Sequence, residues 1–182
     1  MSKVNDFVIC NPSLCIACKA CEKACIKSAY SRGKLNKSRL NVLDLEELKM
    51  PNQCRQCDDA PCANVCPTAT LRLIGGIVTL SEATCIGCKL CTIACPYGAI
   101  VIDAENIPSF KENPSESLAY ESVVGRKSIA LKCDTCGGEP ACVDICPKGA
   151  LVFVKSSGEH KFGKKLKGDM NDFLKDLGVK NE

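Results

Sequence analysis

Four cysteines between residues 84 and 100 have a spacing that suits one redox cofactor. Cys85, Cys88 and Cys91 lie three residues apart, and Cys95 is followed directly by Pro96. This is the run C-x2-C-x2-C-x3-C-P, whose thiolates bind 4Fe-4S clusters in bacterial proteins. Three closely spaced thiolates can bind three corners of a cubane, and in proteins with two clusters the cysteine before proline binds the other cluster. One such motif therefore predicts a second.

Three further motifs repeat this spacing with small changes. The first has Ile26 where the proline is expected, whereas the second and fourth keep Pro67 and Pro147 but have longer middle spacers. Of the 17 cysteines, only Cys10 lies outside the four motifs. The other three motifs hold Cys15, Cys18, Cys21 and Cys25; then Cys54, Cys57, Cys62 and Cys66; then Cys133, Cys136, Cys142 and Cys146.

Zinc and disulfide bonds are the alternatives for so many cysteines. Structural zinc sites usually pair two separated C-x2-C knuckles and rarely gather four Cys so closely. Disulfide frameworks belong to secreted proteins, whereas the N-terminus M-S-K-V-N-D has no apolar stretch, twin arginine or cleavage site. No apolar run approaches the roughly 18 residues that a membrane-spanning helix needs. We therefore expect a cytoplasmic iron–sulfur protein that does not enter the membrane.

The composition agrees with metal as a structural support. Aromatic residues make up 4% of the 182 residues and Trp is absent, so two small units of this size would be marginal on apolar burial alone. The formal charge of +3 counts every cysteine as neutral. Four oxidised clusters, each carrying about −2 with its thiolates, would bring the protein to about −5. The basic pI is thus no evidence for a nucleic-acid partner.

The segments between the motifs predict short strands that position the cysteine loops. Residues 6–10 form an apolar run that leads into the first motif, and residues 128–132 form another before the last. Residues 71–74 and 77–80 flank Gly75-Gly76, which predicts a hairpin with a primed turn. Three motifs continue as P-T-A-T-L, P-Y-G-A-I or P-K-G-A-L. Here we expect proline to end the cysteine turn, small residues to let the backbone pass closely, and strands to follow at residues 99–102 and 150–154.

The remaining segments give weaker signals. Residues 27–39 are polar and basic and predict a surface loop, and residues 103–126 predict a surface insertion. Residues 40–50 fit neither strand nor helix, and Pro51 is expected to end whatever they form. Cys10 is predicted to be a buried, inert thiol. The core is expected to end at Val154.

Residues 155–182 contain no cysteine and predict an amphipathic helix with a break near Gly168. The helix either folds back on its own core or docks on a neighbouring subunit or a second copy, and association with a membrane surface is the remaining alternative. The nearby lysines and His160 are expected to be solvated. The apolar face consists of Phe162, Leu166, Met170, Phe173, Leu174 and Leu177.

The motifs can pair in two ways. The second and third are closer in the chain than either is to its outer neighbour. This favours a nested arrangement, in which the first and fourth motifs form one unit around another made by the second and third. Sequential pairing of one with two and three with four is the rival.

The four-motif order resembles the four-cluster, polyferredoxin-type electron-transfer subunits of molybdenum or tungsten oxidoreductases and hydrogenases. It is most similar to the small subunits of formate hydrogenlyase and hydrogen-dependent carbon dioxide reductase complexes. The resemblance covers residues 4–154. The stretches that carry it are F-V-I-C-N-P-S-L-C-I-A-C-K-A-C, P-N-Q-C-R-Q-C-D-D-A-P-C, C-P-Y-G-A-I and L-K-C-D-T-C.

The resemblance implies an α+β fold of two nested bacterial-ferredoxin-like modules, built from short β-hairpins and short helices around cluster pairs. Residues 1–50 and 103–154 would form the outer module, residues 51–102 the inner one, and residues 155–182 a helical docking tail. It also implies four 4Fe-4S clusters bound crosswise. The four implied ligand sets are Cys15, Cys18, Cys21 with Cys146; Cys133, Cys136, Cys142 with Cys25; Cys54, Cys57, Cys62 with Cys95; and Cys85, Cys88, Cys91 with Cys66.

The expected function is one-electron transfer without catalysis by this chain. The expected partners are a formate dehydrogenase-type subunit, a hydrogenase-type subunit or both, and another polyferredoxin subunit is a further candidate. The C-x3-C-x2-C run of radical enzymes is absent, as are the nucleotide-binding runs G-x-G-x-x-G and P-loop. A freely diffusing polyferredoxin and an oligomer- or filament-forming scaffold are the alternatives. Basic residues beside the ligands are either simply solvated or raise cluster potentials; they are Lys19, Lys23, Lys89, Arg55 and Lys132.

Overall fold

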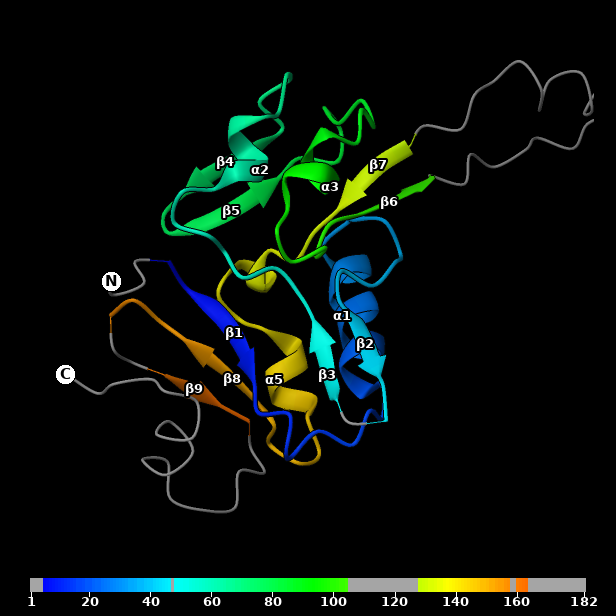
Figure 1. Cartoon of the computed structure of the whole chain (residues 1–182), viewed down its shortest axis with the longest axis vertical. Coiled ribbons are helices and arrows are strands. Elements are labelled where there is room, and N and C mark those ends of the chain that lie inside the picture. The colour runs from blue at the N-terminus through cyan, green and yellow to red at the C-terminus, as the bar shows by residue number, and fades with distance from the viewer. Residues whose placement is uncertain (1–4, 47, 105–127, 158–159, 164–182) are drawn as a thin grey trace, which may run out of the picture.

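The structure is a computed structural model that describes residues 5–46, 48–104, 128–157 and 160–163. It mixes short helices with short antiparallel strand pairs, as expected for a ferredoxin-like α+β fold (Figure 1). In chain order the elements are β1 (Phe7–Cys10), α1 (Ala20–Ser31), β2 (Asn41–Asp44), β3 (Lys49–Asn52), α2 (Pro61–Asn64), β4 (Leu71–Ile74), β5 (Ile77–Leu80), α3 (Leu90–Ala94), β6 (Val101–Ala104), β7 (Ser128–Leu131), the 3-10 helix η1 (Thr135–Gly137), α5 (Ala141–Ile145), β8 (Leu151–Val154) and β9 (Lys161–Phe162).

A three-stranded antiparallel sheet in the order β1-β8-β9 joins the two ends of the described chain. The expected strands near residues 6–10 and 150–154 are confirmed, and they pair with Val8 opposite Phe153 and Cys10 opposite Leu151. These four side chains belong to one apolar cluster, while alternate residues such as Val152 pack on the other face. Because successive side chains along a strand point to opposite faces, both faces of the sheet bury apolar side chains.

The third strand of this sheet corrects the prediction that the core ends at Val154. Strand β9 pairs with β8, and Phe162 packs against Val152 and Val154. Phe162 is therefore in a strand and not on the predicted amphipathic helix. The rest of that predicted face, from Leu166 to Leu177, lies outside the described residues. His160, which is expected to be solvated, is half-buried, and its Nδ1 is buried without a hydrogen-bond partner among the described residues.

Three two-stranded hairpin-like pairs complete the sheet structure. The β4–β5 hairpin is confirmed, and Gly75 and Gly76 both have positive φ (57° and 77°), as a primed turn requires. Strands β2 and β3 show that residues 40–50 contain a second hairpin, and Pro51 is in β3 opposite Val42. The prediction that Pro51 ends the element is therefore wrong. A two-stranded pair has only edge strands, where the missing N–H of proline does no harm.

Strand β6 begins two residues later than predicted, at Val101. Residues before it still belong to the cysteine turn, because the Ala99 N–H donates to the Cys95 sulfur at 3.4 Å. Strand β6 pairs with β7, so residues on either side of the insertion lie together. The insertion itself lies outside the described residues, apart from the end of β6.

Helix α1 corrects the prediction of a surface loop at residues 27–39, because the helix continues through Ser31. The three shorter helices each end just before or near a Cys-Pro pair: α2 before Cys66, α3 before Cys95 and α5 before Cys146. The first motif has Ile26 instead of proline, so nothing stops the helix after Cys25. The result is a helix of 12 residues where the other motifs have four or five.

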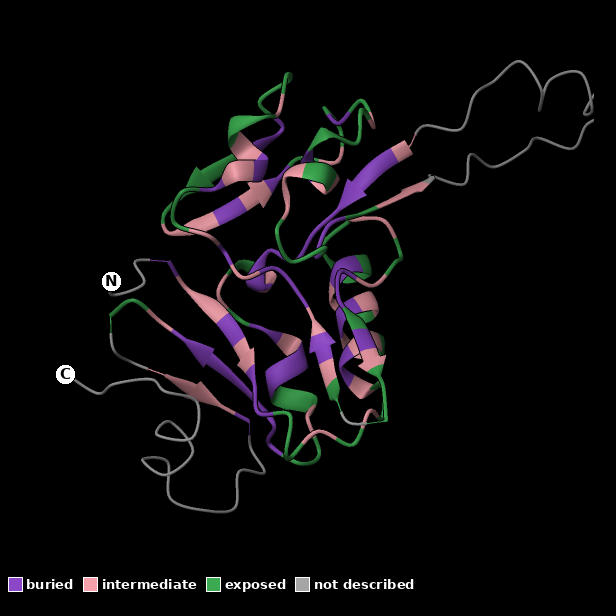
Figure 2. Cartoon of the chain, viewed as in Figure 1, coloured by how far each residue is buried: buried purple, intermediate pink, exposed green. Residues whose placement is uncertain are grey.

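The elements form two groups, which lie in the lower and upper parts of the view in Figures 1 and 2. Each group contains one apolar cluster. The lower cluster joins β1 and β8 to α1 and α5, and includes Cys21, Cys25 and Cys142. The upper cluster joins β4, β5 and β7 to α2 and α3, and includes Cys62 and Cys91. Within the described residues, no helix has the length and apolar character needed to cross a bilayer.

Candidate iron–sulfur cluster sites

All 17 cysteines are free thiols, and the sixteen in the motifs gather in four groups. Each group takes three members from one motif and the fourth from another. We name each group after its first motif cysteine. They are the Cys15 site (Cys15, Cys18, Cys21, Cys146), the Cys133 site (Cys133, Cys136, Cys142, Cys25), the Cys54 site (Cys54, Cys57, Cys62, Cys95) and the Cys85 site (Cys85, Cys88, Cys91, Cys66).

The grouping follows from which thiols lie close enough to interact electrostatically. Cys62 interacts with Cys54, Cys57 and Cys95, and Cys91 interacts with Cys85, Cys88 and Cys66. Cys142 interacts with Cys133, Cys136 and Cys25. The four members of the Cys15 site line a single cavity, and the members of the Cys85 site line another. These are the same four sets that the family resemblance implies as ligands.

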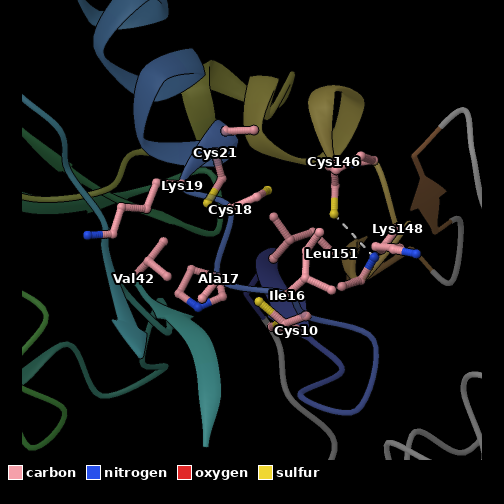
Figure 3. A pocket seen from close by; sticks show the side chains of 15 residues that line it. Cys10, Ile16, Ala17, Cys18, Lys19, Cys21, Val42, Cys146, Lys148 and Leu151 are labelled. Carbon is pink, nitrogen blue, oxygen red and sulfur yellow. Dashed lines mark hydrogen bonds between the residues drawn. The ribbon is translucent and has the colours of Figure 1, made fainter. Parts of the chain in front are cut away.

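Figure 3 shows the cavity of the Cys15 site. The sulfurs of Cys18 and Cys21 lie at the start of α1, and the sulfur of Cys146 reaches the cavity from the end of α5. The Ala150 N–H donates to the Cys146 sulfur at 3.3 Å. Cys10, at the end of β1, lines the same cavity. Cys10 is buried as predicted, and burial, together with the nearby Cys15, raises the pKa of its thiol.

The four sites follow one another through the protein. Cys142 of the Cys133 site also interacts with Cys21 of the Cys15 site, and α1 packs against α5. Cys133 interacts with Cys54, which brings the Cys133 and Cys54 sites together. Helices α2 and α3 pack against each other and carry Cys62 and Cys91 of the last two sites. The order is therefore Cys15, Cys133, Cys54 and Cys85.

The cysteine loops have an unusual backbone that suits an anionic ligand. Residues with positive φ occur in every motif loop, for example Ala17 (52°), Gln56 (49°), Lys89 (68°) and Cys136 (55°). Such turns direct successive N–H groups to one side and form concave nests that bind phosphates and Fe–S centres. Most of these residues are not glycine, so each carries some strain. The strain is consistent with a loop that is held in place by a bound group.

The sulfurs also accept hydrogen bonds from backbone N–H groups. Cys25 accepts from Arg39 and Cys54 from Gln56, both at 3.3 Å, and Cys85 accepts from Ala130 at 3.4 Å. Hydrogen bonds of this kind stabilise negative charge on sulfur and raise the potentials of Fe–S clusters.

The turn after each Cys-Pro pair contains one residue with positive φ. Gly98 and Gly149 have φ of 57° and 62°, and Ala69 takes the same position with 48°. This turn points the next N–H back at the cysteine sulfur. A Cβ at Gly98 would meet nothing within 4 Å. At Gly98 the requirement is therefore positive φ, and not the close passage of the backbone that we predict for small residues in these turns.

Burial raises the pKa of several of these thiols in the absence of metal. It raises the pKa of Cys21 and Cys133 to about 12 and that of Cys62 to about 11. Cys66 differs: burial acts in the same direction, but the N–H of Leu71 and the hydroxyl of Thr68 outweigh it, and its pKa is lowered. Iron must therefore displace protons from several sites, as is usual for thiolate ligands.

No three His, Cys, Asp or Glu side chains among the described residues converge closely enough to bind a single metal ion. A cubane presents four separate iron corners, each bound by one thiolate, so its ligands surround a volume instead of meeting at a point. The donor set, the N–H groups aimed at sulfur and the anion-binding loops fit 4Fe-4S clusters.

Sequence reasoning missed a carboxylate that holds the fourth motif in place. Asp134 accepts from the Cys136 N–H at 3.0 Å and pairs with Arg32 and Lys34, which follow α1. Burial would raise the pKa of Asp134, but these two cations outweigh it and hold the pKa well below its usual range. Asp134 thus ties the Cys133 loop to the segment after Cys25. Its position beside Cys133 was the only signal in the sequence.

Two buried glutamines were also missed. Gln53 donates to the Val8 carbonyl at 3.2 Å, and Gln56 donates to the Cys133 carbonyl at 2.9 Å. Both are almost completely buried. Both hydrogen bonds join segments that are far apart in the chain. The sequence does not show which strand or loop faces these glutamines, so it could not predict their role.

The basic residues that lie beside ligands differ in burial. Lys19, Lys23 and Lys89 are exposed, as solvated side chains would be, and Arg55 is half-buried. Lys132 is only 2% exposed.

The sequence comparisons agree with an iron–sulfur protein. Residues 84–150 match the family described as "4Fe-4S dicluster domain", and residues 12–25 match "4Fe-4S binding domain". The chain is 38% identical over 170 residues to formate hydrogenlyase subunit 2 of Escherichia coli, covering 85% of this chain and 84% of that protein. It is 37% identical over 161 residues to the electron transport protein HydN of the same species (83% and 89%). It is 33% identical over 170 residues to hydrogenase-4 component A (83% of each chain).

Proposed function

Because the chain belongs to the family of 4Fe-4S electron-transfer subunits that includes these relatives, we propose that it carries electrons one at a time between two redox partner proteins. The observation that carries this proposal is the row of four cysteine groups, which begins and ends at the protein surface. Cys18 and Cys88, in the first and last groups, are the two exposed motif cysteines. The chain itself is a carrier and not a catalyst.

The four groups are the proposed ligand sets of four 4Fe-4S clusters. Electrostatic interactions between thiols support three of the sets, and the shared cavity supports the Cys15 set. The pairing of β1 with β8 supports the nested arrangement. In that arrangement residues 1–50 and 103–154 form the outer module and residues 51–102 the inner one. Strands β3 and β6 extend across the two expected boundaries, so the modules would share these hairpins.

Each residue class then has a distinct task. The clusters supply one-electron redox chemistry when bound. The sixteen thiolates fix the position and order of the sites. The N–H groups of Arg39, Gln56 and Ala130 stabilise charge on sulfur. The buried residues around the Cys133 and Cys54 sites exclude water, whereas the outer sites keep one ligand each at the surface.

The surface around Cys88 has the character of a contact region for a partner. Ile86, Leu90 and Ile93 are 63%, 44% and 82% exposed, and they lie in the same loop and helix α3 that carry or follow Cys88. Leu14 and Ile16 are exposed near Cys18 at the other end. Apolar side chains around an exposed redox site favour close docking, and close approach is what electron transfer between proteins requires.

The proposed partners are a formate dehydrogenase-type subunit and a hydrogenase-type subunit in one complex. The names of the relatives, formate hydrogenlyase subunit 2 and hydrogenase-4 component A, support this choice. The cytoplasmic location stays a prediction from the sequence. So does the docking or oligomerisation of the tail through Leu166, Met170, Phe173, Leu174 and Leu177, which lie outside the described residues.

A purified complex tests the proposal. The tagged chain is isolated without oxygen from its native host, and its partners are identified by mass spectrometry. Formate and then hydrogen are added while the clusters are followed by EPR. Reduction by at least one of these substrates, lost when Cys18 and Cys88 are both replaced by Ala, supports the proposal. A monomeric chain that co-purifies with no redox enzyme would indicate the free polyferredoxin, and clusters that no reductant reduces would indicate a scaffold.

A further inference from the structure

Lys132 is a buried cation without a carboxylate partner in the described part of the chain. Its side chain is 2% exposed. Two other cations near the cysteine groups do have one: Arg39 pairs with Glu82, and Lys34 pairs with Asp134. Burying an unpaired ammonium costs several kcal/mol in general. Something else must therefore compensate the charge of Lys132.

The hydrogen-bond partners of Lys132 are neutral. Its Nζ donates to the carbonyls of Val78 (2.5 Å) and Cys133 (2.7 Å) and to Oε1 of Gln56 (3.3 Å). These three acceptors satisfy its three donors, but they supply only dipoles. They fix the position of the ammonium without neutralising it.

The same contacts place Lys132 between two cysteine groups. Cys133 is a member of the Cys133 site, and Gln56 follows Cys54 closely in the loop of the Cys54 site. Gln56 bridges both loops, because its backbone N–H donates to the Cys54 sulfur at 3.3 Å and its amide donates to the Cys133 carbonyl at 2.9 Å. Lys132 also interacts electrostatically with a thiol of each group, Cys62 and Cys133.

We propose that Lys132 is a shared counter-cation of the two inner cluster sites, held by Gln56 between them, and that it raises the reduction potential of both. This inference rests on the proposed function, since it requires both groups to bind clusters. A cluster with four thiolates is anionic and becomes more so on reduction, so a fixed positive charge nearby favours the reduced form. Lys132 acts on the electrons through this charge and is not a ligand.

The test compares holoproteins, loaded without oxygen, with and without the charge. Lys132→Met keeps the length of the side chain and removes the charge, whereas Lys132→Arg keeps the charge. Lys23→Met is the control, because Lys23 is two residues from Cys25 but exposed. The readouts are iron content and the four midpoint potentials from EPR-monitored redox titrations. Cys62→Ala and Cys142→Ala proteins identify the signals of the Cys54 and Cys133 sites.

In Lys132→Met we expect both inner sites to become harder to reduce, by roughly tenfold in the reduction equilibrium, which corresponds to about 59 mV for one electron. Lys132→Arg and Lys23→Met should keep the wild-type potentials. If Lys132→Met does not hold the inner clusters but Lys132→Arg does, the charge is needed to retain them, which also supports the proposal.

Two results would overturn the inference. One is four unchanged potentials in a fully loaded Lys132→Met protein. The other is equal loss of clusters in Lys132→Met and Lys132→Arg, which would show a role in packing alone. A wild-type protein with far fewer than about sixteen irons would instead refute the proposed function, so the two failures are distinguishable.

Discussion

The contact between the third motif and β7 can be tested at Gly87. This residue has φ of +67°, and a Cβ added there would lie 2.4 Å from the Ser128 carbonyl oxygen. Gly98 has a similar φ of +57°, but a Cβ there would meet nothing within 4 Å. Gly87→Ala and Gly98→Ala therefore share the backbone strain and differ in the clash. The pair isolates the effect of close approach.

The strain of an L-residue in this region costs roughly 1–2 kcal/mol, and a clash with backbone adds about 1–3 kcal/mol. Gly87→Ala should thus be the more destabilising by about 1–3 kcal/mol, or roughly fivefold to a hundredfold in a local opening equilibrium. The displaced loop carries Cys85 and Cys88, and the N–H bond from Ala130 to the Cys85 sulfur would be lost with it.

The assay is the rate at which each holoprotein loses iron to a chelator under anaerobic conditions, with EPR to identify the cluster that is lost. We expect Gly87→Ala to lose the Cys85-site cluster first and much faster than wild type, and Gly98→Ala to show a small effect. Equal rates for the two variants would refute the reasoning, since the close contact with Ser128 would then have no energetic consequence.

Three further predictions concern the pH dependence, the core and the docking surface. Asp134→Asn should cost about 1–3 kcal/mol of stability at neutral pH. Because the pKa of Asp134 is lowered in the folded state, its contribution to stability is complete above about pH 4 and is lost as pH falls through the folded pKa. Iron retention by wild type and variant should therefore converge in acid, and a constant difference across pH would contradict this. Phe153→Ala should destabilise by about 3–5 kcal/mol in chemical unfolding, because Phe153 is fully buried, while Leu73→Ala at an exposed position should change little. Ile93→Asp should slow electron exchange with the partner complex without changing iron content or potentials; unaltered exchange would place the docking surface elsewhere.

The cysteine spacing predicted the cofactor, and Gly75-Gly76 predicted the hairpin, because both depend on local chemistry. The turn at Gly75-Gly76 needs only positive φ, and the motif needs only the reach of neighbouring thiolates. The length of α1 was also predictable in principle, since Ile26 in place of proline removes the residue that stops the other helices. The structure shows that this change gives the first motif a helix through Ser31.

Other features could not be read from the sequence because they depend on contacts between distant segments. Lys132 and Lys89 are both lysines beside a motif cysteine, yet one is buried and the other exposed. The difference comes from Gln56 and Val78, which are far from Lys132 in the chain. Strand β9 is likewise stabilised by the edge of β8 and not by a pattern of its own.

Double alanine variants test the crosswise ligand sets most directly. We predict that wild-type protein, purified without oxygen, contains about sixteen irons. Cys21→Ala combined with Cys146→Ala should remove one cluster and leave about twelve irons, whereas Cys21→Ala combined with Cys25→Ala should remove two and leave about eight. The opposite result, with two clusters lost in the first variant and one in the second, would show that each motif binds its own cluster and would contradict the account.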